Sequence, residues 1–355
     1  MRTVGLAVLS TLLLLATHVD HSRACTSFVM ETPEGPIFGC SLDLFVPGDG
    51  LMFINQRGME KTGWVRSTTG EVLEWTSEYG SVTFSLVGRE YAWSGMNDAG
   101  LVISSMQLAS GRYPERDERP PVNDGSVVQY LLDNCGSVEE AIELIGGTRV
   151  QDQSPPCHYL LADEVGGAAA FEYIGGEFLC HVGETLPVRA MANMRYARSA
   201  EAYERGGVKW WWPNPGESAE RVASAEQRCK DFDAVSDTNA VNYAFETLVH
   251  HVAAAHTRWN IVYDIAGRVV HYRSDQSPTY KHVSFADLDF ACRDPLLMLD
   301  VNAQFEGDAF PHFEPYDPTT NRRFFSTFCS RWNLDVSEEV IDALTEHYET
   351  YRCAE

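Results

Sequence analysis

The stretch CTSFVMETPEGPIFGCSLD, residues 25–43, indicates more about the fold than any other part of this chain. Residues 26–31 are a short run that favours β structure, and residues 37–44 are a second such run. Pro33-Glu34-Gly35-Pro36 between them is typical of a turn. The pattern predicts a β-hairpin that brings Asp43 back toward Cys25. There Asp43 either orients a reactive group or is only a turn residue at a strand end, and the residues leave both readings open.

The first 24 residues have the pattern of a secretory signal peptide. Arg2 precedes an apolar stretch over residues 4–16, and a polar tail closes with the small residues Ser22 and Ala24. The apolar stretch is about 13 residues, whereas a membrane-spanning helix needs about 20. We therefore expect cleavage before Cys25, no stable membrane insertion, and a secreted or periplasmic protein. Lipid attachment at Cys25 and cleavage at another bond are the alternatives.

An amino-terminal cysteine has a chemistry of its own, because its α-amine can act as the general base for its own thiol. The unperturbed pKa of an α-amine is about 7.7 to 8, close to neutral pH. Cleavage before Cys25 would thus create a nucleophile and its base in one residue. The alternative is that Cys25 is an ordinary disulfide partner.

The chain has nine cysteines, an odd number for a protein of an oxidising compartment. Eight of them suffice for four disulfides, so one thiol must stay reduced or pair between chains. The count does not say which cysteine this is.

The formal net charge of −24 limits the partners that this protein can have. Such acidity argues against binding nucleic acid or anionic lipid surfaces, whereas a single site for a small molecule can still be locally basic. Whether the chain forms a homo-oligomer is not readable from the sequence.

The sequence contains none of the common cofactor motifs. It has no G-x-S-x-G elbow, no P-loop and no dinucleotide fingerprint, so serine hydrolase, nucleotide and redox-cofactor chemistry find no support. His250, His251 and His256 lie close together, but they lack an H-E-x-x-H pattern and accompanying carboxylates. We therefore expect neither a cofactor nor a metal.

The rest of the chain alternates short strands with helices, which indicates an α+β fold. Tight turns such as Asp98-Ala99-Gly100 favour antiparallel pairing. Further strands are expected over residues 82–86, 91–94, 101–107, 158–163, 168–173, 259–265 and 268–273, and helices over residues 127–133, 137–145, 196–204, 217–230, 239–254 and 335–351. Cys329 and Cys353 flank the last helix, so we expect disulfide bonding to tie this C-terminal extension to the body.

Several of these segments resemble the choloylglycine hydrolase family, which includes bile salt hydrolases and penicillin V acylases. The segments are Cys25-Thr26-Ser27, Gly39-Cys40-Ser41-Leu42-Asp43, Gly95 to Leu101, Ser137 to Ala141, Met191-Ala192-Asn193, Trp259 to Asp264 and Leu288-Asp289-Phe290. The resemblance covers most of residues 25–302 and leaves the last fifty residues outside. It implies a four-layer αββα sandwich of the N-terminal nucleophile hydrolases, with residues 25–302 as the amidase domain, 1–24 as the signal peptide and 303–355 as an extension packed on the domain.

The resemblance also implies an activity and a set of site residues. The activity is hydrolysis of non-peptide linear amides of N-acylated small molecules through a thioester acyl-enzyme. Cys25 is then the nucleophile, Asp43 binds its α-amine, and Asn193 contacts the amine and helps to form the oxyanion hole. Arg221 is the candidate for the cation that favours the thiolate, and Gln107 stands where the family often has an oxyanion asparagine.

One departure from the family pattern bears on activity. Three residues before Asp43, where the family has an arginine, this chain has Cys40. The change removes a charge that lowers a thiol pKa, and it introduces a thiol able to form a silencing disulfide with Cys25. A catalytically impaired secreted binding protein on the same scaffold, and an acyltransferase or thiol peptidase with the same nucleophile, are therefore the alternatives to an amidase.

Overall fold

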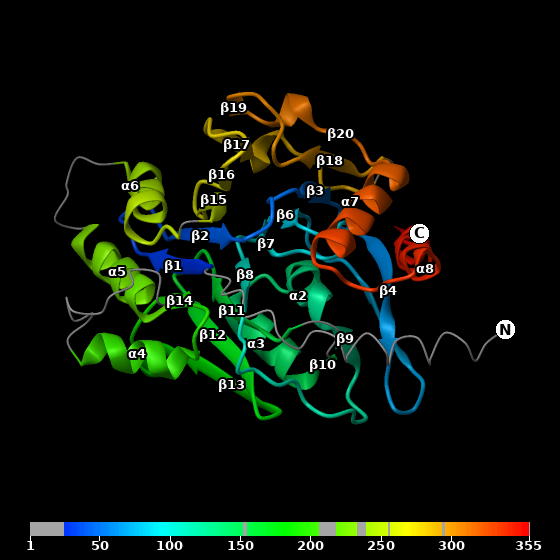
Figure 1. Ribbon diagram of the computed structural model, residues 1–355, viewed down its shortest axis with the longest axis horizontal. Coiled ribbons are helices and arrows are strands. Elements are labelled where there is room, and N and C mark those ends of the chain that lie inside the picture. Colours follow the sequence, from blue (N-terminus) through cyan, green and yellow to red (C-terminus); the bar gives the residue numbers. More distant parts are fainter. Residues whose placement is uncertain are drawn as a thin grey trace.

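The computed structural model describes residues 25–151, 155–205, 218–232, 239–254, 256–292 and 295–354. The expected signal peptide, residues 1–24, lies outside them. Two large sheets stack face to face at the centre of the molecule (Figure 1). The first has seven strands in the order β14 (Ala190–Ala192), β1 (Thr26–Met30), β2 (Ile37–Asp43), β15 (Thr257–Asp264), β16 (Val269–Ser274), β17 (Lys281–Ser284) and β19 (Gly307–Asp308).

The second sheet has nine strands, and all its neighbours are antiparallel. Their order is β13 (Glu177–Val182), β12 (Ala168–Ile174), β11 (Cys157–Ala162), β8 (Val102–Gln107), β7 (Ser94–Asn97), β6 (Ser81–Ser85), β3 (Leu51–Asn55), β18 (Leu297–Asp300) and β20 (Glu314–Pro315). In the first sheet only β17 and β19 pair in parallel.

Helices cover the outer face of each sheet (Figure 1). On the seven-stranded sheet these are α5 (Ser218–Asp231) and α6 (Ala240–Glu246), with α4 (Tyr196–Glu204) packed on α5 and β14. On the nine-stranded sheet α2 (Val127–Asn134) packs against β7 and β8, and α3 (Val138–Gly147) packs on α2. The four-layer αββα sandwich is thus confirmed.

The first hairpin forms as expected. β1 pairs antiparallel with β2, so that Thr26 lies opposite Ser41 and Ser27 opposite Cys40. All residues of both strands are buried, because the hairpin lies inside its sheet between β14 and β15. Gly39 is needed here, since a Cβ atom at this position would collide with the Phe28 ring.

Several predicted elements have different bounds in the structure, and the following two differ for a visible reason. The strand expected over residues 91–94 begins only at Ser94, because the Ser85 hydroxyl donates to the carbonyls of Gly88 and Tyr91 and holds the preceding segment as a turn. The helix expected over residues 239–254 continues α6 as a π-helical turn, Thr247–His251, and ends there.

The last fifty residues are joined closely to the rest of the chain. They add β19 to one sheet and β20 to the other, and they form α7 (Pro318–Arg331), which the sequence analysis missed, and α8 (Glu338–Tyr348). The terminal β21 (Arg352–Cys353) pairs with β4 (Met59–Arg66), which forms a hairpin with β5 (Val72–Thr76). A parallel pair of β9 (Pro121–Asn123) and β10 (Arg149–Gln151) completes the fold.

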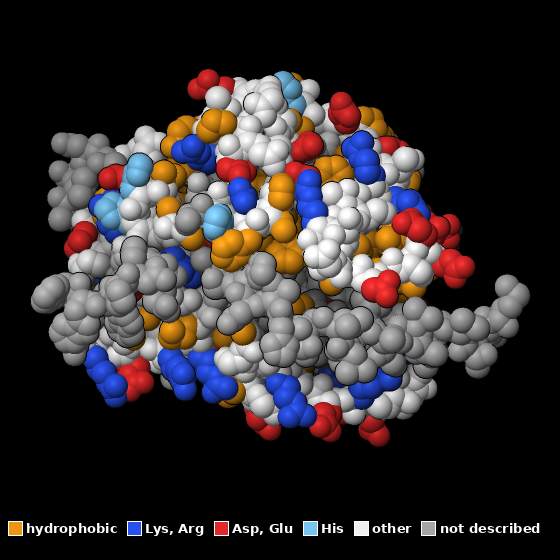
Figure 2. Space-filling view, in the orientation of Figure 1, with side chains coloured by type: hydrophobic (Ala, Val, Ile, Leu, Met, Phe, Trp, Pro, Cys, Tyr) orange, Lys and Arg blue, Asp and Glu red, His pale blue; other side chains and the backbone are white. Residues whose placement is uncertain are grey.

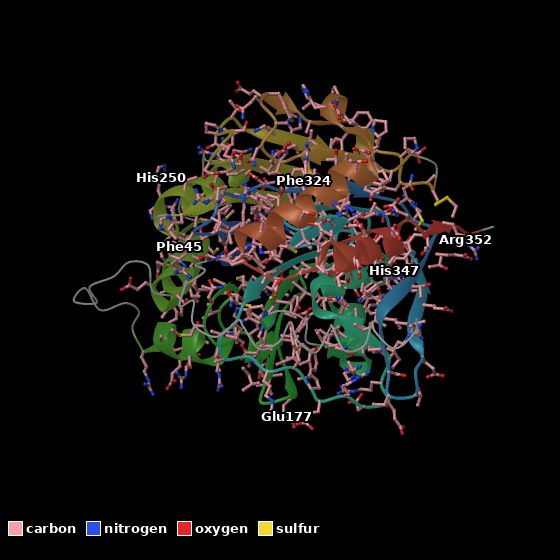
Figure 3. The ribbon with its side chains drawn as sticks, turned by 45° about the vertical axis from the view of Figure 1, so that its right-hand side comes forward. Phe45, Glu177, His250, Phe324, His347 and Arg352 are labelled. Carbon is pink, nitrogen blue, oxygen red and sulfur yellow. A yellow bond between two sulfur atoms is a disulfide. The ribbon has the colours of Figure 1, made fainter. Side chains whose placement is uncertain are left out.

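One disulfide forms among the described residues. Cys292 and Cys353 are bonded, with their Cα atoms 5.5 Å apart, and the bond lies beside Arg352 in Figure 3. It ties the C-terminal extension to the body as expected, but Cys292 takes the place of Cys329. The Cys329 thiol is free and packs with Phe325 and Ile341 in the core under α7 and α8, so it behaves as a small apolar side chain.

Candidate active site

Cys25 directly precedes β1 and is 3% exposed. β1 lies between β14 and β2, with Thr26 paired to Ala192 on one side and to Ser41 on the other. Extended by one residue, this register sets Cys25 opposite Asn193 on one side and beside the end of β2 on the other. The neighbours of Cys25 are therefore fixed by the first three strands of the sheet.

Asp43 ends β2 and is buried at 1% exposure. The Thr257 hydroxyl donates to one carboxylate oxygen, and the Ser41 hydroxyl donates to the other at 3.4 Å. Burial raises the pKa of Asp43 to about 6, although these hydroxyls and the charges of Arg221 and Arg258 act in the opposite direction. This carboxyl group therefore changes charge near neutral pH.

Arg221 projects from α5 and is buried at 2% exposure. Its Nε donates to the Thr26 hydroxyl at 2.9 Å, and its Nη2 lies 3.5 Å from the Cys25 carbonyl oxygen and 3.4 Å from Asn193 Oδ1. Nη2 also lies 3.3 Å from the Ser218 hydroxyl. One buried guanidinium thus contacts the main chain of Cys25 and the side chain of Asn193.

Asn193 follows β14 and is held on both sides of its amide. Its Nδ2 donates to the main-chain carbonyl of Gln107 at 2.9 Å, and its Oδ1 accepts from Arg221. Gln107 ends β8 in the other sheet, so this hydrogen bond crosses between the two sheets. Gln107 thus joins the site through its backbone, and an oxyanion role for its side chain stays a prediction.

Cys40 has a free thiol, so the disulfide with Cys25 considered from the sequence does not form. It lies in β2 opposite Ser27 and faces the second sheet, where its Sγ lies 3.7 Å from the Ser94 hydroxyl. Burial raises the pKa of the Cys40 thiol far above its usual range. Cys40 therefore contributes no charge to the site at neutral pH.

The structure brings together all five residues that the sequence analysis singled out: Cys25, Asp43, Gln107, Asn193 and Arg221. Sequence reasoning missed Thr257 and Thr26, whose hydroxyls hold the Asp43 carboxylate and the Arg221 guanidinium. Thr257 lies two residues before Trp259, where a strand was expected to start, and it is the first residue of β15, so a search for hydroxyl residues at strand starts would have found it. The site contains a buried cation, a carboxylate near its titration point and an amide donor beside one thiol, which are the components of acyl transfer by a cysteine.

Two further features of the described residues concern metals and membranes. No group of three or more His, Cys, Asp or Glu side chains within them is arranged to hold a metal ion. Their helices are all too short or too polar to cross a bilayer. Acidic and basic side chains are interspersed on the face shown in Figure 2.

Residues 25–193 match the model of the linear amide C–N hydrolases, choloylglycine hydrolase family. The chain is similar to this family over just under half of its length. The matched range includes Cys25, Asp43, Gln107 and Asn193, whereas Arg221 lies beyond it. The protein is thus a linear amide hydrolase, an enzyme class that acts on carbon–nitrogen bonds other than peptide bonds.

Relatives with established names extend the likeness to most of the chain. A penicillin V acylase from Pectobacterium atrosepticum is 25% identical over an aligned length of 349 residues. The alignment covers 84% of this chain and 92% of that protein. The structure of penicillin V acylase from Agrobacterium tumefaciens superposes with a TM-score of 0.68 at 23% identity, and covers 83% of this chain and 98% of its own. A variant of conjugated bile acid hydrolase from Clostridium perfringens gives 0.62 at 13% identity, with 79% and 97% covered. The two structural matches establish a shared fold.

Proposed function

We propose that this protein is an exported amidase that hydrolyses N-acylated small molecules with Cys25 as its nucleophile. The observation that carries the proposal is the position of Arg221, whose guanidinium contacts both the Cys25 main chain and the Asn193 amide while its charge acts on Asp43. A buried cation at this point favours the thiolate form of a neighbouring cysteine. Arg221 thereby supplies a positive charge in a site where Cys40 replaces the family arginine.

The reaction proceeds in two halves, and Cys25 acts in both. The Cys25 thiolate attacks the amide carbonyl carbon, and the C–N bond breaks as the α-ammonium of Cys25 protonates the leaving amine. The resulting thioester is attacked by water, which the α-amine deprotonates, and the C–S bond breaks to release the carboxylic acid and restore the thiolate. Asp43 binds the α-ammonium and keeps it directed at the reacting atoms.

Asn193 stabilises the oxyanion of both tetrahedral intermediates. One Nδ2 hydrogen is bound to the Gln107 carbonyl, and Arg221 contacts Oδ1, so the amide plane is fixed before substrate binds. An amide nitrogen has a second hydrogen, which is available for an oxyanion. Removal of such a donor costs about 10² to 10³ in turnover.

The substrates are proposed from the relatives. Two of the similar proteins reported above are penicillin V acylases, so we propose aryloxyacyl and related acyl amides as the first class to assay. Penicillin V itself is the first compound to test.

Amino-terminal sequencing and two variants test the proposal. The mature exported protein is expected to begin at Cys25, Cys25→Ala to lose amidase activity, and Cys25→Ser to be processed at the same bond but to turn over much more slowly. Full amidase activity in Cys25→Ala would overturn the proposal. Iodoacetamide separates the amidase from a binding protein on the same scaffold, because only the amidase requires a fast-reacting thiol in the folded state.

A further inference from the structure

A buried histidine–carboxylate pair lies beneath the turn that carries Asn193. His158 in β11 is fully buried, and Glu172 in β12 is 1% exposed. His158 Nδ1 lies 3.5 Å from Glu172 Oε2. Both side chains point into the space between the sheets, because their strand neighbours Leu160 and Ala170, two residues away, belong to the core there. A buried carboxylate is costly, so its retention here requires a reason.

Glu172 holds the far end of the Asn193 turn. Its Oε2 accepts a hydrogen bond from the Tyr196 main-chain amide at 3.0 Å, and Tyr196 is the first residue of α4. The Tyr196 hydroxyl donates to the Val188 carbonyl at 2.7 Å, so this residue is fixed at both its amide and its ring. The start of α4 therefore has a defined position relative to β12.

His158 lies at the near end of the same turn. Its ring lies close to Glu172 and to Ala192, the last residue of β14, but neither ring nitrogen makes a hydrogen bond among the described residues. Burial lowers the pKa of His158, whereas burial of Glu172 is outweighed by its contacts with His158 and the Tyr196 amide, which lower the pKa of Glu172. A neutral imidazole thus lies beside an ionised carboxylate.

We propose that Glu172 and His158 are positioning residues for Asn193. Glu172 holds residue 196 by a hydrogen bond and His158 lies against residue 192, so the two side chains support both ends of the three-residue segment that carries Asn193. The inference rests on the proposed function, because it assigns the pair to the oxyanion donor of that reaction. The contacts of this pair lie at the two ends of the segment that carries Asn193, so its effect on catalysis passes through Asn193.

The test measures kcat and KM separately for Glu172→Ala, Glu172→Gln and His158→Leu. We expect Glu172→Ala to lower kcat about 10-fold, less than the 10² to 10³ of removing a donor outright, because Asn193 is displaced but still present. KM is expected to change little. Glu172→Gln keeps an oxygen that accepts from the Tyr196 amide, so it should recover most of kcat. His158→Leu should resemble Glu172→Ala.

Three controls separate positioning from general damage. Asp133→Asn changes another fully buried carboxylate, which lies in α2 away from the site, and should leave kcat unchanged. The rate of Cys25 alkylation by iodoacetamide should be unchanged in the Glu172 variants, because alkylation needs no oxyanion donor. In an Asn193→Ala background Glu172→Ala should lower kcat no further.

The outcomes distinguish this inference from the proposed function. An unchanged kcat in both Glu172→Ala and Glu172→Gln, or a loss of kcat that adds fully to that of Asn193→Ala, would overturn the positioning role. A full kcat in Asn193→Ala itself would instead overturn the proposed oxyanion donor. If Glu172→Ala does not fold, His158→Leu decides the question, because an unchanged kcat in that variant would overturn the positioning role.

Discussion

The molecule buries carboxylates in several places, and two of these places differ in how the carboxylates are paired. Near the C-terminal extension, the Lys61 ammonium lies 2.9 Å from both Glu90 and Asp133, and the three side chains are at most 3% exposed. Trp75 Nε1 also donates to Asp133 at 2.8 Å. In the part of the candidate active site that the structure describes, the Asp43 carboxylate accepts hydrogen bonds only from hydroxyl groups, while Arg221 and Arg258 act on it through their charges.

The difference separates a structural cluster from a reactive one. In the Lys61 cluster the buried charges are paired, because each of them has an opposite charge at hydrogen-bonding distance. Asp43 lacks such a partner in direct contact among the described residues. The α-ammonium proposed for the mature Cys25 is the group that would complete this site. The contrast between the two clusters can be tested by replacing one charged side chain in each of them.

The largest expected effect is on stability, at Lys61. Lys61→Met leaves Glu90 and Asp133 buried without their cation, so we expect the free energy of unfolding to fall by about 3–5 kcal/mol. Denaturant unfolding measures the change. Turnover per folded molecule should be unchanged, and a selective loss of kcat with stability intact would contradict a purely structural role.

The terminal disulfide belongs to the same structural region. Replacing both partners, as Cys292→Ser with Cys353→Ser, should lower the free energy of unfolding by about 2–4 kcal/mol, because the bond restricts the unfolded chain. Thermal melting with and without reductant provides the measurement. The reductant should lower the Tm of the native protein alone, and an equal shift in the double variant would show that another bond is involved.

For Asp43→Asn we expect the opposite pattern, a loss of activity with little change in stability. We expect amidase activity to fall about 10²-fold, because the α-amine loses the carboxylate that orients it for proton transfer. Stability should change little, since an uncompensated buried carboxylate is removed. Steady-state kinetics and thermal melting on the same sample test both statements. Full activity in Asp43→Asn would show that Asp43 is only a turn residue at a strand end and takes no part in catalysis.

The smallest effect is on the pH profile. The raised pKa of Asp43 means that its proton is retained up to about pH 6, where an ordinary aspartate is already ionised. As pH falls through this region the carboxyl becomes neutral, and kcat/KM should decline about tenfold per pH unit below the apparent pKa. The α-ammonium of a mature Cys25 would move this limb to lower pH. Survival of the same limb in Asp43→Asn would assign it to another group.

The sequence by itself determined the elements that depend on neighbouring residues. The β1–β2 hairpin follows from two β-favouring runs around a proline–glycine turn, and the start of α3 follows from Ser137, whose hydroxyl accepts from the Glu140 amide as its spacing predicts. The candidate site residues could be predicted from the resemblance to the family, because the family's motifs occur in the same order along this chain. In each case the information is local, or repeats at a recognisable spacing.

The tertiary structure decided which distant residues meet. Thr257 reaches Asp43 and Arg221 reaches Thr26 across about 200 residues, because the sheet sets β15 beside β2 and α5 packs on β1. No local pattern encodes such partners, since a strand with the same alternation fits several places in a sheet. The disulfide partner of Cys353 was also decided by the tertiary structure. Cys353 bonds to Cys292 and not to Cys329, because a disulfide needs Cα atoms within about 7 Å and only the folded chain sets that distance.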